Sequence, residues 1–354
     1  MISDSNKNVV AMRPASEERS EPARSLVLSV ENLSVAFGAL HVVSGVSFEL
    51  HEGETLAIVG ESGSGKSVTS LAMLGLHGAK AKVDGTIVFR HGDRSLNIAV
   101  QPESVLRDLR GREMSMIFQE PMTSLNPVLR IGEQLAEVLH NHGKVSTTDA
   151  RERALAMLRT VGISNPEQRL RAYPHELSGG MRQRVMIAMA LMKSPRILVA
   201  DEPTTALDVT IQAQILDLLR TLQRQMKMGI IFITHDLGVV AEIADQVAVM
   251  YSGRIVEQGP VEAILKAPRH PYTRALMDSV PHVGADGERV PLTSISGSIP
   301  NLAKPPAGCR FHPRCPYAVA GRCDQDEPAL EAIDPRRRVR CVRWNELSLS
   351  REEI

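Results

Sequence analysis

Hydrophobic positions in this chain form short, strand-length runs separated by longer amphipathic stretches. Thr55–Val59, Ile197–Ala200, Gly229–Thr234 and Gln246–Tyr251 are apolar nearly throughout, as is typical of strands buried on both faces. The clearest amphipathic stretch begins near Val209 and repeats apolar residues at steps of three and four. These residues are Ile211, Ile215, Leu218, Leu219, Leu222 and Met226. Strands that alternate with helices predict a parallel α/β sheet covered on both faces.

The two ends of the chain depart from this pattern. Residues 1–25 have the composition of a disordered polar tail, and their apolar stretch, Val9–Met12, is too short for a signal-peptide core. Around Pro260 the chain becomes rich in Pro, Gly and Arg, and its periodicity weakens. We therefore expect a main domain over residues 26–265 and a small extension over residues 266–354.

Composition narrows the class of protein. With 43% hydrophobic and 23% charged residues, the 354-residue chain is of ordinary globular type. Its 41 Lys and Arg residues balance 41 Asp and Glu residues, so it has no overall basic excess with which to bind nucleic acid. No apolar run approaches the roughly 18–20 residues that cross a bilayer. We expect a cytoplasmic chain that neither binds nucleic acid nor spans a membrane.

The strongest chemical signal is a phosphate-binding loop. Gly60-Glu61-Ser62-Gly63-Ser64-Gly65-Lys66-Ser67 fits G-x-x-x-x-G-K-[ST] in full, after a predicted strand and before a predicted helix. Glycines let backbone N–H groups turn toward phosphates, and the helix N-terminus adds its positive end. Lys66 supplies a charge for the β- and γ-phosphates, and the Ser67 hydroxyl can reach Mg²⁺. The loop predicts a nucleoside triphosphate site.

Two carboxylates follow the predicted strand Ile197–Ala200, at Asp201 and Glu202. By themselves they are a weak signal that a solvated loop would explain better, and the phosphate loop makes the pair informative. Sites in parallel sheets form at the carboxyl ends of strands, so both are expected beside the phosphate loop. Asp201 is then expected to hold Mg²⁺ through water, and Glu202 to orient and activate the attacking water.

A second phosphate-binding turn is predicted where Ser178-Gly179-Gly180 opens a helix. In isolation this segment would fit a capped helix with flexible glycines just as well. One chain rarely needs two such devices for one nucleotide. The two turns make sense if each binds a different nucleotide, or if one nucleotide is shared between two subunits.

Taken together, residues 26–260 resemble the nucleotide-binding subunit of an ABC transporter. The motifs of that family occur in its order over about two-thirds of the chain. They are the Walker A loop (Gly60–Ser67), the Q-loop glutamine (Gln119), the signature (Leu177–Arg184), the Walker B strand (Ile197–Asp201) followed by Glu202, the D-loop (Ala206–Asp208) and the switch histidine (His235). The resemblance implies a P-loop NTPase fold with a RecA-like parallel core, an antiparallel β subdomain and an α-helical signature subdomain.

The resemblance also implies a head-to-tail dimer that sandwiches two ATP molecules. Walker A of one subunit and the signature of the other, including Leu177, Ser178, Gly179, Gly180 and Gln183 here, would hold each ATP. Ser178 and Gly180 would touch the γ-phosphate of the ATP bound by the second subunit.

Four further residues receive roles by the same resemblance. His235 would contact the γ-phosphate in its own site, Gln119 would sense Mg²⁺ and the membrane subunit, and Asp208 belongs to the D-loop. Phe37 lies where the family places an aromatic that stacks on adenine, although it would also fit as a core residue.

The C-terminal sequence indicates a subfamily. His270–Leu276 and Gly308–Pro316 resemble the extension of oligopeptide and dipeptide importer ATPases, as does Met122–Pro127 near the Q-loop. This implies ATP-driven peptide uptake at the cytoplasmic face of the inner membrane. The implied partners are a second, homologous ATPase subunit, two membrane permeases and an extracytoplasmic substrate-binding protein. Nickel, glutathione and some saccharide importers share the extension, so the cargo stays open.

Two other classes fit less well. A soluble ABC ATPase that acts on nucleic acid or ribosomes usually carries two cassettes or a long coiled-coil insertion, whereas this chain has one cassette and no heptad run. An exporter commonly fuses its membrane domain to the cassette, whereas no membrane-spanning run is predicted in this sequence.

All four cysteines lie in the extension, at Cys309, Cys315, Cys323 and Cys341. In a reducing compartment such a group favours a metal site over disulfides. Zinc sites usually contain C-x₂₋₄-C pairs, which are absent here, so the spacing favours iron. Some importer ATPases that this chain resembles carry a [4Fe-4S] cluster on four such cysteines. Zinc and free thiols are the alternatives.

Overall fold

The computed structural model describes residues 24–119, 124–141, 143–205, 207–280 and 294–349. The predicted polar tail lies almost wholly outside these residues, as do Met122, Thr123 and Ala206.

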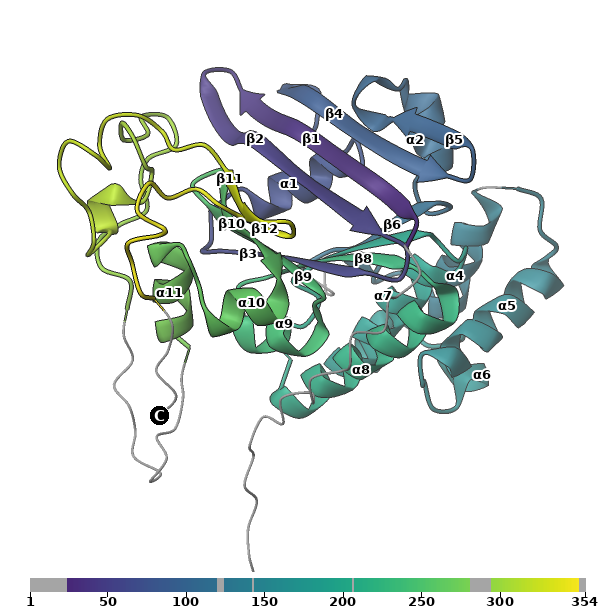
Figure 1. Ribbon diagram of the computed structural model, residues 1–354. Helices are drawn as coiled ribbons and strands as arrows, with labels where there is room; N and C mark the ends of the chain where they lie inside the picture. The colour runs from purple at the N-terminus through teal and green to yellow at the C-terminus, as the bar shows by residue number, and fades with distance from the viewer. Residues whose placement is uncertain (1–23, 120–123, 142, 206, 281–293, 350–354) are drawn as a thin grey trace, which may run out of the picture.

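An eight-stranded sheet forms the centre of the molecule, in the order β11-β12-β10-β9-β3-β8-β7-β6 (Figure 1). Five neighbouring strands are parallel: β9 (Gln246–Tyr251), β3 (Thr55–Val59), β8 (Gly229–Thr234), β7 (Ile197–Asp201) and β6 (Met114–Ile117). Every residue of β3, β7 and β8 is buried, which explains why their sequences are continuous apolar runs. The predicted parallel α/β sheet is confirmed.

The sheet continues with three antiparallel strands that the hydrophobic pattern does not predict. They are β10 (Arg254–Pro260), β12 (Arg337–Val339) and β11 (Glu331–Asp334). β12 pairs with β10, so residues from the far end of the chain extend the central sheet.

A second sheet of four strands, in the order β2-β1-β4-β5, is antiparallel. Its strands are β1 (Leu26–Phe37), β2 (Leu40–His51), β4 (Ala81–His91) and β5 (Arg94–Asn97). The connection from β5 continues through η1 (Ile98–Val100) and α2 (Glu103–Leu109). Helix α1 (Lys66–Met73) contacts β1 and β2 on one side and β7 on the other, so the two sheets enclose the helix that follows the phosphate loop.

A group of helices covers the β6 end of the central sheet. It contains α4 (Ile131–His140), α5 (Thr147–Thr160), α6 (Pro166–Arg169), η2 (Pro174–Glu176), α7 (Gly179–Leu191) and α8 (Val209–Met226). The α5 helix begins where its sequence predicts, because the Ser146 hydroxyl accepts a hydrogen bond from the Asp149 N–H. On α8 the periodic residues Ile215, Leu219 and Leu222 are buried in one apolar cluster shared with α4, α5 and α7.

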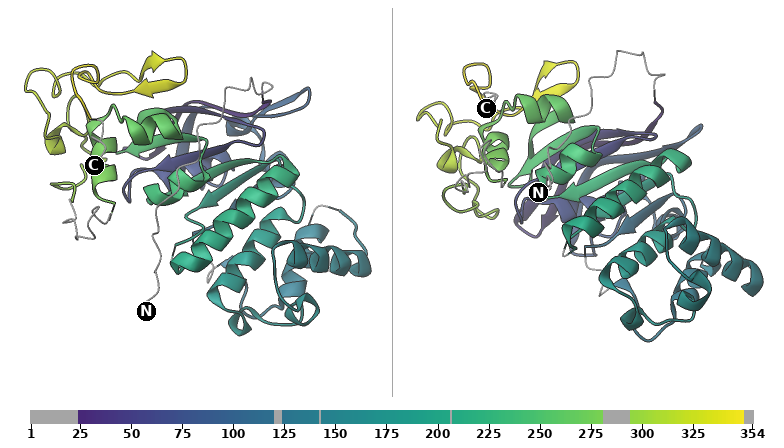
Figure 2. Two further views of the ribbon diagram at one scale, coloured as in Figure 1. Left: turned by 60° about the horizontal axis from the view of Figure 1, so that its bottom comes forward. Right: turned by 90° about the horizontal axis from the view of Figure 1, so that it is seen from below.

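The C-terminal residues pack at the opposite end of the molecule from α4, α5 and α6 (Figures 1 and 2). This end contains α9 (Leu237–Ile243), α10 (Val261–Lys266), α11 (Pro271–Asp278) and η3 (His312–Arg314). Three rings join it to the central sheet: Tyr251 of β9 lies 4.5 Å from Tyr272 and 5.2 Å from Phe311, centroid to centroid. The division at residue 265 stays a prediction, and the segments on its two sides share an apolar cluster.

Candidate nucleotide-binding site

The phosphate loop runs from the end of β3 to the start of α1, and its glycines are required by geometry. Gly60 has φ +154°, and a Cβ there would lie 2.1 Å from the carbonyl oxygen of Met250. Gly65 caps α1 with φ +100°, and a Cβ there would lie 3.0 Å from the carbonyl oxygen of Val42. Only glycine fits both positions without displacing neighbouring backbone. The loop therefore has the strand–loop–helix context that its sequence predicts.

Lys66, the first residue of α1, is buried within this loop. Its Nζ donates hydrogen bonds to the carbonyl oxygens of Gly60, at 2.7 Å, and Glu61, at 3.0 Å. Burial lowers the pKa of Lys66, while the negative charges of Glu202, Asp201 and Glu61 act in the opposite direction. The ammonium group is thus held at the mouth of α1, close to two acidic side chains of the β7 end.

Asp201, the last residue of β7, is 4% exposed. Burial raises the pKa of its carboxyl group, and hydrogen bonding by the Ser67 hydroxyl and the charge of Lys66 oppose that shift. Its Oδ1 has no hydrogen-bond partner in the described part of the chain. A buried carboxylate with a free oxygen beside a hydroxyl is the oxygen-rich donor set that Mg²⁺ prefers, so these residues fit the metal.

The Glu202 carboxylate contacts two other predicted site residues, Gln119 and His235. Its Oε2 accepts hydrogen bonds from Gln119 Nε2 at 3.2 Å and from the Thr205 hydroxyl at 2.9 Å. Its Oε1 lies 3.2 Å from Nδ1 of His235, a side chain that is 62% exposed. The structure therefore brings Gln119, Glu202 and His235 together from three separate segments.

Two features of this cluster lie beyond the sequence prediction. Glu202 adopts φ +46°, a left-handed conformation that is uncommon for a residue with a side chain and that re-aims its carboxylate after the strand. The Thr205 contact was missed as well. The signal available was a hydroxyl three residues after Glu202 in a turn, which is too common to be specific.

The signature turn begins α7, in a different part of the fold. The Ser178 hydroxyl caps the helix by accepting a hydrogen bond from the Met181 N–H at 3.4 Å. A Cβ at Gly180 would lie 2.9 Å from Cγ2 of Ile211, so the turn packs closely against α8. Gln183 is buried, and neither polar atom of its side chain has a partner among the residues described.

The two phosphate-binding turns belong to separate apolar clusters. Helix α7 packs on α4, α5 and β6, whereas α1 packs on β1, β2 and β7. Of the other predicted residues, Asp208 caps α8 by accepting from the Ile211 N–H at 2.9 Å, and Phe37 ends β1 with its side chain partly exposed. The remainder of the D-loop includes Ala206, which lies outside the described residues.

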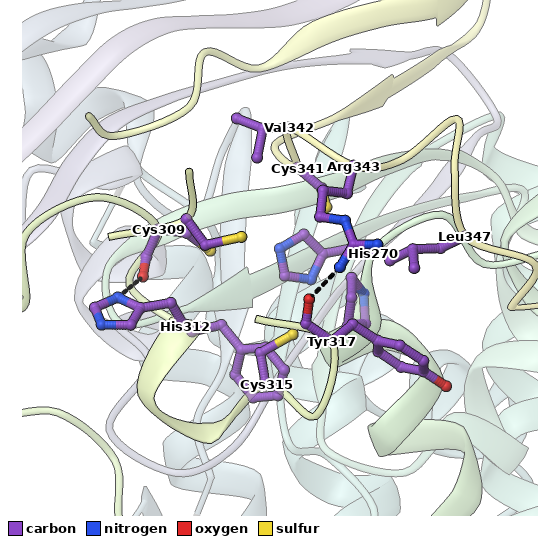
Figure 3. A pocket seen from close by; sticks show the side chains of 12 residues that line it. His270, Cys309, His312, Cys315, Tyr317, Cys341, Val342, Arg343 and Leu347 are labelled. Atoms are coloured by element: carbon purple, nitrogen blue, oxygen red, sulfur yellow. Dashed lines mark hydrogen bonds between the residues drawn. The ribbon is translucent and has the colours of Figure 1, made fainter. Parts of the chain in front are cut away.

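The four cysteines of the extension line a single cavity beside α11 and η3 (Figure 3). All four are free thiols, and His270, Phe311 and His312 complete part of the wall. Burial is the main cause that raises the pKa of Cys309, Cys315 and Cys341, each to about 11, and neighbouring cysteines add to the shift. Burial also lowers the pKa of His270 to about 3, so its ring is neutral.

The cavity has the donor chemistry of a thiolate metal centre, because four cysteines are among its lining residues. In the described segments, however, no group of three or more His, Cys, Asp or Glu side chains is arranged to hold a metal ion. The predicted iron–sulfur cluster is therefore not supported by this geometry and stays a prediction.

Comparison with known proteins agrees with the site. A profile of the ABC transporter family matches residues 43–205, and one described as the oligopeptide/dipeptide transporter C-terminal region matches residues 256–323. The dipeptide transport ATP-binding protein DppD of Bacillus subtilis is 50% identical over 322 residues, which cover 89% of this chain and 94% of the relative. A probable peptide ABC transporter ATP-binding protein, y4tR of Sinorhizobium fredii, is 50% identical over 336 residues, covering 93% and 98%.

Solved structures give the same fold. The cbiO1 subunit of Clostridium perfringens, part of the cbiONQ transporter complex, has a TM-score of 0.58 and 28% identity, covering 68% of this chain and 90% of that chain. The dimeric bacterial cassette MJ0796 has a TM-score of 0.57 and 27% identity, covering 66% and 98%.

A phosphate loop, a carboxylate strand and a signature helix on this sheet define an ABC-type ATPase. The chain belongs to the ATP-binding proteins of ABC transporters, in the branch that carries the oligopeptide/dipeptide transporter C-terminal region. None of the described helices combines the length and apolar character that crossing a bilayer requires.

Proposed function

We propose that the chain hydrolyses ATP to drive the uptake of di- and oligopeptides through separate membrane subunits. The observation that carries the proposal is the cluster around Glu202, in which Gln119 and His235 meet one carboxylate at the end of the strand that holds Asp201. Peptide cargo is supported by relatives such as the dipeptide and oligopeptide transport ATP-binding proteins of Bacillus subtilis, each 50% identical to this chain.

In this proposal the chain's residues divide the work on ATP. Backbone N–H groups of Ser62–Gly65, together with Lys66, bind the phosphates. Ser67 and Asp201 would hold Mg²⁺, which when bound would neutralise charge on the phosphate oxygens. Glu202 accepts a proton from the attacking water, and His235 and Gln119 orient its carboxylate and the γ-phosphate beside it.

The signature would complete the ATP site of a second subunit. Ser178 caps α7, and Gly179 and Gly180 begin it; the first two are exposed and Gly180 is partly exposed, so they are available to face another chain. The dimeric state of the MJ0796 cassette supports this arrangement. The second subunit in this proposal is a homologous ATPase, and the pair acts with two permeases and a substrate-binding protein at the cytoplasmic face of the inner membrane.

The cysteine cavity is proposed to hold a [4Fe-4S] cluster through Cys309, Cys315, Cys323 and Cys341. The support is the donor set, because all four cysteines line one cavity. A structural role suits an extension whose own apolar sequence is sparse, because small modules often need a metal centre to fold stably.

Transport by the reconstituted complex tests the proposed cargo. Proteoliposomes that contain this chain, its second ATPase, both permeases and the binding protein should accumulate labelled di- or oligopeptide only when MgATP is present on the side of the ATPases. Nickel, glutathione and a saccharide serve as competing cargoes. Uptake of one of these in place of peptide would contradict the peptide assignment but leave the ATPase assignment intact.

A further inference from the structure

Glu61, inside the Walker A loop, is paired with an arginine of the C-terminal extension. Nη1 of Arg314 lies 2.7 Å from Oε2 of Glu61, and Nη2 lies 3.1 Å from Oε1, so the pair is bidentate. The Arg314 side chain is only 4% exposed. Bidentate, charge-assisted pairs of this kind fix orientation as well as adding energy.

The backbone of Glu61 is held on two further sides. Its N–H donates a hydrogen bond to the hydroxyl of Tyr272, a residue of α11, at 2.8 Å. Its carbonyl oxygen accepts from Nζ of Lys66 at 3.0 Å. Glu61 thus connects Lys66 to Tyr272 and Arg314. These two residues follow Glu61 in sequence by 211 and 253 positions.

The Arg314 side chain is itself held by a backbone carbonyl group and an aromatic ring. Its Nε donates to the carbonyl oxygen of Ser296 at 2.9 Å, and its guanidinium carbon lies 5.8 Å from the ring centroid of Tyr251. The Tyr251 ring packs edge-on against Phe311, with an interplanar angle of 84°. Hydrogen bonds and ring contacts together fix the guanidinium before any nucleotide arrives.

We propose that Arg314 and Tyr272 are positioning residues for the Walker A loop, through which the C-terminal extension sets the affinity of the chain for ATP. The inference rests on the proposed binding of ATP at this loop. Tyr272 holds the loop backbone in place, which lowers the cost of ordering it around phosphate. Arg314 neutralises the Glu61 carboxylate, which would otherwise repel a polyphosphate anion.

The negative charge of Glu61 lies near the ammonium group of Lys66 in the phosphate loop. Nζ of Lys66 donates a hydrogen bond to the carbonyl oxygen of Glu61 itself at 3.0 Å, so the ammonium group lies close to this acidic residue. Removing Arg314 leaves Glu61 unpaired beside the same lysine. The carboxylate then competes with phosphate for Lys66, and ATP affinity falls.

The fold offers a matched control for a purely structural effect. Arg337 of β12 and Glu257 of β10 form another buried ion pair between the extension and the sheet, 2.5 Å apart, with side chains 6% and 0% exposed. Arg337 also donates to the carbonyl oxygen of Ala267. Neither residue of this pair belongs to the phosphate loop. Glu257 also accepts hydrogen bonds from the backbone N–H groups of Arg269 and His270, so the control variant changes Arg337 and keeps Glu257. Losing the Arg337 side chain should destabilise the junction without removing a direct contact to the phosphate loop.

The test is a titration of the full-length chain with MgATP, carried out on variants that remain folded at the chosen temperature. Arg314→Met should weaken ATP binding by about tenfold, and Arg314→Lys by less, because it keeps the charge but loses the fork. Arg337→Met should lower the melting temperature and leave ATP affinity unchanged. Glu61→Gln added to Arg314→Met should restore much of the lost affinity, because the unpaired charge is gone.

Three results would overturn the inference. One is equal ATP affinity in Arg314→Met and Arg337→Met, and another is a double variant that binds ATP as weakly as Arg314→Met. Failure of the unaltered chain to bind ATP would overturn the proposed function and this inference together, and it is recognised in the first titration, before any variant is compared.

Discussion

At the scale of single residues, Glu202 differs from a surface carboxylate in the number of groups that meet it. Gln119, Thr205 and His235 all approach its two oxygens within 3.2 Å, and the left-handed backbone at Glu202 directs the side chain toward them. A general base needs this kind of fixed orientation. The proposed mechanism therefore depends on the charge of one carboxylate.

We expect Glu202→Gln to bind ATP normally and to lose most hydrolysis at its own site. Glutamine keeps the size and hydrogen-bonding capacity of the side chain but cannot accept the proton, which should reduce the rate on the order of 10²–10⁴. The measurement is phosphate release by the assembled complex, alongside nucleotide binding. Near-normal turnover would rule out this role for Glu202.

Lys66→Ala should instead impair nucleotide binding itself. The ammonium group is preplaced in the loop by the carbonyl oxygens of Gly60 and Glu61, and its loss removes a charge that meets phosphate. A titration with MgATP measures the change. An affinity equal to that of the unaltered chain would contradict the assignment.

At the scale of elements, the sequence predicts those strands and loops whose structure depends on the local pattern of residues. The buried strands Thr55–Val59 and Gly229–Thr234 were predicted with the bounds that the structure has, because both of their faces are covered and their sequences are apolar throughout. The phosphate loop could also be predicted from the sequence, because local backbone geometry requires its glycines. Roles assigned to the site residues stay predictions until they are tested.

What could not be predicted depends on contacts between distant segments. The β10, β11 and β12 strands are short or end in proline, and their pairing is decided by packing at the sheet edge. Arg314 lies 253 residues from Glu61, and no local pattern relates the two. The sequence also could not show that the extension and β9 would share a cluster of three aromatic rings.

The extension carries the prediction about metal. Chain purified without oxygen should be brown, with a broad visible absorption band and bound iron, because four thiols line one cavity. Substituting Cys309 and Cys315 by serine should remove the colour. Colourless, iron-free protein after anaerobic handling would leave zinc or free thiols as the remaining interpretations.

The same thiols give the metal-free chain a pH dependence. The pKa of Cys309, Cys315 and Cys341 is raised from 9.0 to about 11 in the folded state, so this state holds protons that the unfolded state has already lost. The contribution to stability is complete below about pH 9 and lost as pH rises toward 11. Denaturant unfolding of metal-free chain at pH 8, 9 and 10 should therefore show falling stability. A variant with alanine at the three positions should show a shallower decline, and identical slopes would contradict the explanation.

At the scale of the whole molecule, the two phosphate-binding turns lie on helices of separate apolar clusters. In the proposed dimer, a single chain would provide the loop for one ATP and the signature for another. The extension packs at the opposite end of the molecule from α4, α5 and α6 (Figures 1 and 2). The proposed sharing of ATP sites would make catalysis a property of the assembly.

The most direct test compares ATP turnover per chain in dilute, isolated protein with turnover in the complete membrane complex at the same MgATP concentration. We expect the isolated chain to be a poor ATPase, because donors from the second subunit that stabilise the transferring phosphoryl group are absent. Assembly should raise the rate, and Ser178→Ala in this chain should lower it at the site of the second subunit. Equal turnover in the dilute monomer and the complex would contradict the shared-site account.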